Sequence, residues 1–393
     1  MITASGTAAT TFLLSIDLLA YILFMKAFSL FLVVTLLLLS FSTPAQNHVA
    51  KRLARKEKIA IDSAVCQEMR QQHIVGLSVG IVANGRVILT KGYGLANLEQ
   101  AVLATPQSVY KLGSVSKQMV AAAIMLLIQE NKLHLTDTLP RFFKGAPPSW
   151  NKITVRQLLN HTSGLPRDSP LLDNMKQQPD SVLIKGAYKS PLLFEPGTDW
   201  RYCNLGYFML ADIIRQLSKQ PFATFMQEQV FAKYNLSRTR TTTFSAVVQD
   251  RAAGYVYKQG EGISNATNYL ALRPSGAFLS TIDDMLRWEV LIQQHQLLSK
   301  SNWELMWTDT VRTAKASQDP IEYYGYGWDV SEYHQRRVVH HDGTIPGFTS
   351  SYFRFIDSKT AIIVLTNADN AYPKTVALRI ADILFQEKTA NAK

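Results

Sequence analysis

The spacing of hydrophobic positions changes along the chain, and it predicts β-rich ends around a helical middle. Apolar residues recur at helical spacing over residues 50–72 and again over 375–386. Between two strand-like stretches early in the chain, Asn84-Gly85 is typical of a two-residue hairpin turn. The stretches that we expect to form strands are 76–82, 86–93, 337–341, 350–355 and 360–367.

The middle of the chain, about residues 150–270, has mostly helical patterning. The helices expected there are 154–161, 206–217 and 222–231. One sheet built from both ends of the chain, with an inserted helical lobe, explains this order better than three tandem domains. We therefore predict an α+β fold, with an antiparallel sheet flanked by helices from about 50–125 and 275–390, and an all-helical lobe from about 126–274.

The first 45 residues have the layout of an export signal. Met25-Lys26 precedes an apolar run from Ala27 to Phe41, and the small residue Ala45 follows as at a signal-peptidase site. We expect Met25 to be the true start and cleavage to leave residues 46–393, exported to the periplasm or the outside. The competing interpretation is an uncleaved membrane anchor over roughly 11–41, with the main domain external. N-terminal sequencing of the mature protein separates the two.

The composition is that of a globular protein with a sizeable core. Of 393 residues, 47% are hydrophobic and 18% are charged, which excludes a disordered chain. The formal net charge is +11, but the basic run at 51–58 is typical of a solvated helix face. No basic stretch is interleaved with aromatic residues as in single-strand binders, so we expect no nucleic-acid partner. Cys66 and Cys203 make no disulfide framework, and we expect two free thiols.

Ser114 and Lys117 are the strongest candidates for chemistry. They stand three residues apart, just before the apolar run 119–128, which predicts a buried helix too short to span a membrane. Residues i and i+3 share a helix face, so Lys117 could accept the Ser114 proton if burial lowered its pKa. Ser116 would point to a different face. The alternative is a helix N-cap serine followed by a surface lysine, because this spacing alone is common.

A second candidate motif is Tyr202-Cys203-Asn204, which follows a Pro-Gly turn. A tyrosine near a lysine can act as a base, and an asparagine can orient both a lysine and a substrate amide. On its own the tripeptide fits packing and a turn equally well.

A third candidate motif is His341-Asp342-Gly343-Thr344. The glycine would let a substrate approach the backbone, and the Thr344 N–H could join the Ser114 N–H as an oxyanion hole. The alternative is a plain hairpin turn. Adjacent residues such as His340 and His341 point to opposite faces of a strand, so we assign no metal site.

In this order and spacing, the motifs Ser114-x-x-Lys117, Tyr202-x-Asn204 and His341-Asp-Gly343 resemble those of the serine β-lactamase and penicillin-binding-protein superfamily. The resemblance covers about residues 55–388 and is greatest to the class C β-lactamase-related group, which includes β-lactamases, D-Ala-D-Ala carboxypeptidases, D-aminopeptidases and esterases. It implies a β-lactamase/transpeptidase-like fold. The flanking segments that also match are Leu158–Pro166, Phe194–Gly197, Tyr202–Tyr207, Pro274–Thr281 and Leu365–Asn367.

The resemblance also implies a role for each motif residue. Ser114 would be the acylated nucleophile and Lys117 its proton acceptor. Tyr202 would be the general acid and base for the leaving group and the deacylating water. Asn204 would hold Lys117 and the substrate amide, while the Thr344 N–H behind Gly343 would complete the oxyanion hole with that of Ser114.

His341 departs from the β-lactamase pattern, since it stands where those enzymes carry the lysine of Lys-Thr-Gly, and Asp342 replaces the threonine. A histidine is mostly neutral at pH 7 and replaces a fixed cation only in part. The substitution therefore argues against efficient β-lactam hydrolysis.

From the export signal, the motifs and this resemblance together, we expect a monomeric, exported serine hydrolase that works through an acyl-enzyme without cofactor or metal. Its substrate would be a small molecule or peptidoglycan-like, with an ester or a D-amino-acid peptide favoured over a β-lactam. The alternative is a non-catalytic penicillin-recognition sensor that binds cell-wall fragments. Intact Ser114, Lys117 and Tyr202 count against that alternative, because a pure binder would not need all three.

Overall fold

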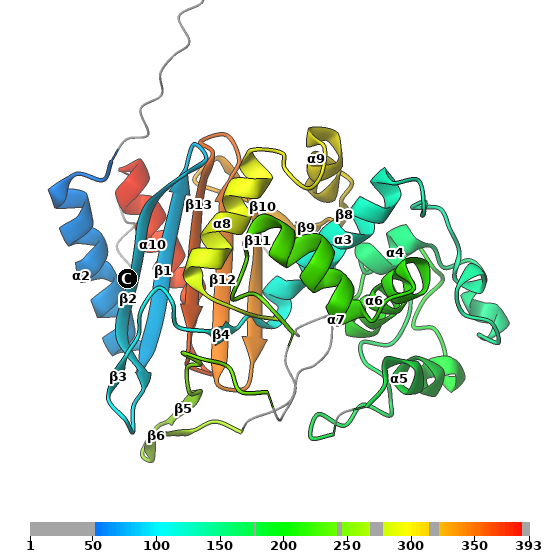
Figure 1. Cartoon of the computed structure of the whole chain (residues 1–393), viewed down its shortest axis with the longest axis horizontal. Coiled ribbons are helices and arrows are strands. Elements are labelled where there is room, and N and C mark those ends of the chain that lie inside the picture. The colour runs from blue at the N-terminus through cyan, green and yellow to red at the C-terminus, as the bar shows by residue number, and fades with distance from the viewer. Residues whose placement is uncertain (1–51, 177, 242–245, 268–277, 314–321, 387–393) are drawn as a thin grey trace, which may run out of the picture. The chain divides into compact units, whose positions relative to one another are not determined.

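A nine-stranded antiparallel sheet, counted over the described residues, forms the centre of the fold (Figure 1). The structure is a computed structural model that describes residues 52–176, 178–241, 246–267, 278–313 and 322–386. These residues belong to one compact unit, Ala50–Lys393. The predicted export signal lies outside the described residues, and within them no helix has both the length and the apolar character needed to cross a membrane.

Strands from both ends of the chain join in this one sheet, as the sequence predicts. Strand β1 pairs with its hairpin partner β2 on one side and with the last strand, β13, on the other. The order is β3 (Val102–Leu103), β2 (Arg86–Asn97), β1 (Gly76–Ala83), β13 (Thr360–Thr366), β12 (Phe348–Phe355), β11 (Arg336–Ile345), β10 (Asp329–Tyr333), β9 (Tyr323–Tyr324) and β8 (Val311–Arg312). All five predicted strands are confirmed.

The predicted hairpin turn between β1 and β2 is also confirmed. Asn84 and Gly85 both have positive φ angles, 50° and 71°. Such a pair matches the right-handed twist of the two strands, which is why the Asn-Gly sequence is informative.

Two helices, α2 (Arg55–Gln71) and α10 (Pro373–Phe385), cover one face of the sheet (Figure 1). On β1, the side chains of Leu77, Val79 and Ile81 join the apolar cluster beneath these helices. They alternate along the strand because successive strand residues point to opposite faces. Both helices occupy the ranges that the apolar periodicity predicts.

Helix α8 (Ile282–Gln293) lies over the other face and shares a core with the buried helix α3 (Lys117–Gln129). A Cβ on Gly80 would come within 2.6 Å of Leu286 in α8. The glycine therefore lets α8 pack close to the sheet.

The region predicted to form a helical lobe contains several short helices and one hairpin that the patterning did not predict. The α-helices among its described residues are α4 (Val155–Leu159), α5 (Asp180–Gly186), α6 (Asn204–Ser218) and α7 (Phe222–Phe225). The short turns there are η2 (Leu139–Arg141), η3 (Pro148–Trp150), η4 (Ala187–Lys189), the π-turn η5 (Met226–Phe231) and η6 (Ala232–Tyr234). The hairpin joins β5 (Tyr255–Lys258) to β6 (Gly262–Asn265). Each strand has four residues; β6 is mostly exposed and β5 is only partly buried, so the two carry little hydrophobic alternation.

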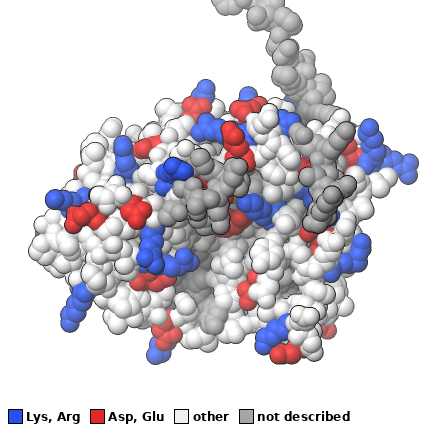
Figure 2. All heavy atoms as spheres, turned by 180° about the vertical axis from the view of Figure 1, so that it is seen from behind, with Lys and Arg blue, Asp and Glu red and all other residues white. Residues whose placement is uncertain are grey.

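The surface agrees with the sequence interpretation of the basic residues. Arg55, Lys56 and Lys58 are exposed on α2. On the face shown in Figure 2, Lys and Arg side chains are interspersed with Asp and Glu and do not gather in one patch. These three residues of the basic run are therefore solvated on a helix, as predicted, while Lys51 lies outside the described residues.

Candidate active site

Ser114 lies on a tight turn that leads directly into the buried helix α3. The turn is a 3-10 helix, η1 (Gly113–Ser116), and α3 begins at Lys117. Ser114 is half-buried, whereas its neighbour Ser116 is fully buried and accepts a hydrogen bond from the Phe278 N–H at 3.3 Å. The two serines therefore point to different faces, and Ser114 alone remains accessible to a substrate.

Lys117 is fully buried beside this serine. Its Nζ lies 3.4 Å from Ser114 Oγ and donates to Asn204 Oδ1 at 2.9 Å. Burial, and then the positive charge of Arg167, hold the pKa of Lys117 well below its ordinary value. Both effects favour the neutral amine, whose lone pair can accept the Ser114 proton.

Asn204 is oriented by an acid that the sequence did not reveal. It is the first residue of α6, and the Cys203 Sγ caps that helix by accepting from the Gly206 N–H. Asn204 Nδ2 donates to Asp168 Oδ1 at 3.0 Å, which leaves its Oδ1 facing Lys117. Asp168 thus fixes which way the amide points.

Tyr202 completes the cluster around Lys117. Lys117 Nζ lies 4.6 Å from the centre of the Tyr202 ring, and the Arg167 guanidinium carbon lies 5.3 Å from the same ring centre. Burial raises the pKa of Tyr202, and the neighbouring Ser114 hydroxyl offsets only part of this shift. Tyr202 Oη is buried and has no hydrogen-bond partner among the described residues. The phenol is therefore protonated at neutral pH and available as a proton donor.

His341 faces the same cluster from β11, while His340 points to the other face of the sheet, as predicted. His341 Nδ1 lies 2.6 Å from the Asp342 carbonyl oxygen, so it carries the proton, and Nε2 accepts from the Tyr324 hydroxyl at 3.1 Å. Burial, and then the charge of Lys117, lower the pKa of His341 to about 3. His340 instead lies 3.0 Å from the Ser331 hydroxyl through its Nε2.

The backbone around Gly343 lies against the turn that carries Ser114. A Cβ on Gly113 would come within 2.8 Å of the Thr344 nitrogen, and a Cβ on Gly343 would come within 2.1 Å of the Leu112 oxygen. Glycine is needed at both positions for this close approach, and Gly113 also has a positive φ of 53°. The N–H groups of Ser114 and Thr344 are brought close together, as an oxyanion hole requires.

His161 and Tyr324 also belong to this site, although no sequence motif predicted a role for either residue. The His161 ring is fully buried 4.4 Å from Tyr202 and 4.6 Å from Tyr324, measured between ring centres. Burial, and then the charge of Lys117, hold the pKa of His161 well below its ordinary value. His161 lies in segment 158–166, one of the flanking segments that match the superfamily, and this match was the sign in the sequence that it could belong to the site. Tyr324 lies in a stretch with no readable motif.

Acid should lower the free energy of unfolding of the protein, and His341→Gln should make this loss of stability smaller. The unfolded chain binds a proton on His341 below about pH 6.5, but the folded protein does so only near pH 3, so stability falls as pH drops between these values. A glutamine can still accept from Tyr324 but binds no proton. Between pH 6 and pH 4, we expect the free energy of unfolding of the variant to fall less steeply, by up to about 1.4 kcal/mol per pH unit.

Urea unfolding at a series of pH values measures this difference. His134→Gln is the matched control, since His134 is exposed in the folded protein. Equal pH slopes for wild type and His341→Gln would contradict a neutral, buried His341.

The described residues contain no group of three or more His, Cys, Asp or Glu side chains placed to hold a metal ion. Cys66 and Cys203 are both free, and Cys203 is buried as the α6 cap. The groups that the cluster brings together are a serine hydroxyl, a lysine amine with a lowered pKa, a phenol and two backbone N–H groups.

Curated relatives resemble the chain over most of its length. Protein flp of Staphylococcus aureus (strain COL) is 26% identical over 339 residues, which cover 83% of this chain and 66% of flp. A penicillin-binding protein of Bacillus subtilis (strain 168) is 26% identical over 344 residues, covering 81% and 74% of the two chains. The match thus spans a little less than two thirds of flp.

Solved structures have the same fold. The octameric penicillin-binding protein homologue from Pyrococcus abyssi superposes with a TM-score of 0.76 at 25% identity, covering 84% of this chain and 77% of that one. The D-amino acid amidase from Ochrobactrum anthropi SV3, in complex with L-phenylalanine amide, also has a TM-score of 0.76, at 20% identity and with 84% and 99% coverage. The predicted β-lactamase/transpeptidase-like fold is confirmed.

The Beta-lactamase family model matches residues 61–385, which include all three motifs. The match covers most of the chain and agrees with the fold and with the penicillin-binding relatives. The protein belongs to the β-lactamase family, within the superfamily of serine β-lactamases and penicillin-binding proteins.

Proposed function

We propose that the protein is a serine hydrolase that forms an acyl-enzyme on Ser114. The observation that carries the proposal is the environment of Lys117. A buried lysine whose pKa is held low, 3.4 Å from an accessible serine hydroxyl, is an activated base next to a nucleophile. A helix-cap serine with a surface lysine would show none of these features.

Acylation follows from the positions of the four groups. Lys117 accepts the Ser114 proton as Oγ bonds to the substrate carbonyl carbon, and the N–H groups of Ser114 and Thr344 stabilise the oxyanion. When the tetrahedral intermediate collapses, the bond to the leaving group breaks and Tyr202 donates its phenolic proton to that group. Lys117, now a cation 4.6 Å from the ring centre, stabilises the phenolate.

Deacylation reverses these proton transfers. The Tyr202 phenolate accepts a proton from water as the water oxygen attacks the acyl carbon. Ser114 Oγ then leaves and takes its proton back from Lys117. The enzyme returns to its starting state, and the net reaction is hydrolysis.

We further propose that the leaving group is neutral, as in a simple amide or ester. His341 is neutral and buried on the Tyr202 side of the site, 6.3 Å from Tyr202 between ring centres. The family's lysine at this position would attract a carboxylate, and His341 does not supply that charge. The fold neighbours that are D-amino acid amidases support an amide substrate.

A pair of substrates that differ in one group tests this proposal. N-acetyl-D-alanyl-D-alanine has a leaving group with a free carboxylate, and its C-terminal amide has a neutral one. We expect kcat/KM to be at least about tenfold higher for the amide, because the neutral His341 supplies no charge to offset the desolvation of a carboxylate. A preference for the free carboxylate would contradict the neutral-leaving-group proposal, while turnover of either substrate would still support an acyl-enzyme.

Export, with cleavage after Ala45, and a monomeric state remain part of the proposal. The n-region, apolar run and small residue before position 46 support export. N-terminal sequencing of the mature protein is expected to begin at Gln46, and an intact start at Met1 or Met25 would instead support the membrane anchor. Size-exclusion chromatography with light scattering tests the monomer.

A further inference from the structure

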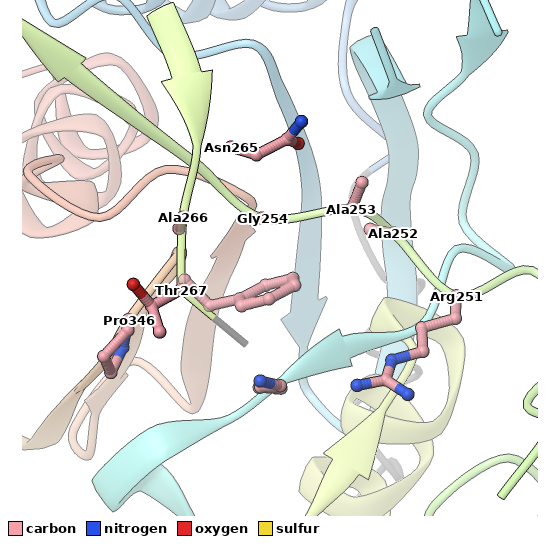
Figure 3. A pocket seen from close by; sticks show the side chains of 10 residues that line it. Arg251, Ala252, Ala253, Gly254, Asn265, Ala266, Thr267 and Pro346 are labelled. Atoms are coloured by element: carbon pink, nitrogen blue, oxygen red, sulfur yellow. The ribbon is translucent and has the colours of Figure 1, made fainter. Parts of the chain in front are cut away.

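A pocket of about 390 Å³ lies beside the β11–β12 turn and is separate from the Ser114 cluster. Its walls come from three parts of the chain: β4 (Tyr110–Lys111), the segment 251–254 with the end of β6, and the β11–β12 turn. Figure 3 shows Arg251 and Pro346 on opposite sides of this space. A pocket of this size holds a small organic group.

Two cations, Lys111 and Arg251, line this pocket. Hydrogen bonds from the Val109 N–H to the Asp250 oxygen at 2.9 Å, and from the Ala252 N–H to the Val109 oxygen at 3.0 Å, hold the segment that carries Arg251 beside β4. The Arg251 guanidinium extends into the space between the walls (Figure 3). Lys111 Nζ lies 5.5 Å from the Phe348 ring centre.

The charge balance of the pocket favours an anion. Of the described residues that line it, none is acidic. Burial, and then the charge of Arg251, lower the pKa of Lys111 to about 8, so the lysine still carries its charge at pH 7. The argument depends on the charges of the described lining residues, two cationic and none acidic, and not on either side chain lacking a partner. An anion would relieve the repulsion between the two cations.

The pocket is within reach of a substrate bound at Ser114. Lys111 precedes Ser114 by three residues, so their Cα atoms are at most about 11 Å apart. Pro346 follows Thr344 by two residues, a span of at most about 7 Å. One short acyl group can therefore have its carbonyl at Ser114 and its other end in the pocket.

The order of residues along β11 indicates which part of the substrate points there. Thr344, the expected oxyanion donor, lies between His341 and the Pro346 wall of the pocket. Tyr202, the proton donor for the leaving group, lies on the His341 side. Leaving group and acyl group extend to opposite sides of a scissile carbonyl, so the acyl group extends toward the pocket.

We propose that Lys111 and Arg251 bind a carboxylate on the acyl part of the substrate, a few carbons from the scissile carbonyl. This inference rests on the proposed acyl-enzyme function and adds a substrate class to it. Phe348, Pro346 and Ala252 supply an apolar wall along which a short methylene spacer can pack. The protein would therefore prefer the ester or amide of a dicarboxylic or acidic acyl group over its neutral counterpart.

Two esters with one leaving group test the proposal. The 4-nitrophenyl monoester of adipic acid carries a terminal carboxylate, and the matching ester of adipamic acid carries a neutral amide there. We expect wild type to favour the carboxylate by about 10- to 100-fold in kcat/KM, the usual value of a charge-assisted contact. Lys111→Met and Arg251→Gln should each bring the ratio toward one, since the ratio within a variant cancels any general loss of activity.

Lys258→Met is the matched control. Lys258 is exposed on the neighbouring hairpin and does not line the pocket. Its substitution removes one positive charge, as Lys111→Met does, so the variant's ratio of kcat/KM values for the two esters should equal that of wild type. A wild-type ratio near or below one, or a ratio that neither pocket variant changes, would overturn the inference. Free adipate that alters hydrolysis of the neutral ester without competing with the charged ester would indicate a separate anion site and would also overturn it.

Failure of the pocket and failure of the proposed function give different results. If wild type hydrolyses both esters equally and Ser114→Ala hydrolyses neither, only the pocket inference fails. If wild type acylates with neither ester, the proposed function fails for esters. Calorimetric binding of the two esters to Ser114→Ala then still tests the pocket, where equal affinities would refute it.

Discussion

Ser114→Ala is expected to lower kcat/KM by about ten-thousandfold or more and to prevent any covalent adduct. The alanine removes the accessible hydroxyl that lies 3.4 Å from the low-pKa Lys117, and removal of a serine nucleophile typically costs this much. Intact-mass measurement after mixing with a penicillin or an activated ester shows whether acyl groups attach to wild type and not to the variant. A persistent β-lactam adduct would indicate carboxypeptidase-like behaviour, and rapid turnover would indicate β-lactamase activity.

Ser116→Ala is the matched control for this experiment. Its hydroxyl is buried and accepts from the Phe278 N–H, so it takes no part in acylation, and the variant should still form the adduct. If Ser114→Ala kept full biological activity, the protein would instead be a non-catalytic sensor of cell-wall fragments. That result would overturn the proposed function.

Tyr202→Phe is expected to separate activity from stability. We expect kcat to fall by about 100- to 10,000-fold, because the leaving group and the deacylating water lose their proton donor and acceptor. The free energy of unfolding should stay within about 1 kcal/mol of wild type, since no described protein group donates to or accepts from Tyr202 Oη. Steady-state kinetics and urea unfolding measure the two quantities on one preparation.

Tyr207→Phe should show the reverse effect. The Tyr207 hydroxyl donates to the Leu159 oxygen at 2.9 Å in the core, so its removal should cost about 1 kcal/mol or more of stability. Activity per folded molecule should change by only a few fold. A Tyr202→Phe enzyme within threefold of wild type would show that Tyr202 is not the proton donor.

The features of this protein that could be predicted from the sequence are those determined by residues close together along the chain. Ser114 and Lys117 share a face because they are three residues apart on a helical segment, and the adjacent apolar run required burial. Asn84-Gly85 likewise determines its turn through backbone angles alone. Such features need no knowledge of the rest of the fold.

Features that depend on distant contacts were not predictable. Asp168 orients Asn204 across 36 positions, and Tyr324 reaches His341 from a separate strand. Lys111 and Arg251 line one pocket although they are 140 positions apart. Backbone hydrogen bonds between the two segments bring them together, and no sequence motif predicts those bonds. The low pKa of His341 also depends on this packing, because burial and Lys117 cause it.

Membership of the β-lactamase family is shown, but the assignment to its class C-related group remains a prediction. Replacement of the Lys-Thr-Gly lysine by His341 fits the esterase and peptidase-like members of that group. The relative activities on esters, D-peptides and β-lactams will decide it.

The β11–β12 turn limits how the specificity of this protein can evolve. The same few residues place the Thr344 N–H against Ser114 and, through Pro346 and Phe348, form one wall of the pocket. An insertion in this turn would shift the oxyanion donor together with the pocket and reduce turnover of every substrate. Lineages that acquire new acyl preferences should therefore vary the opposite wall, residues 251–267, and keep the length of the turn constant.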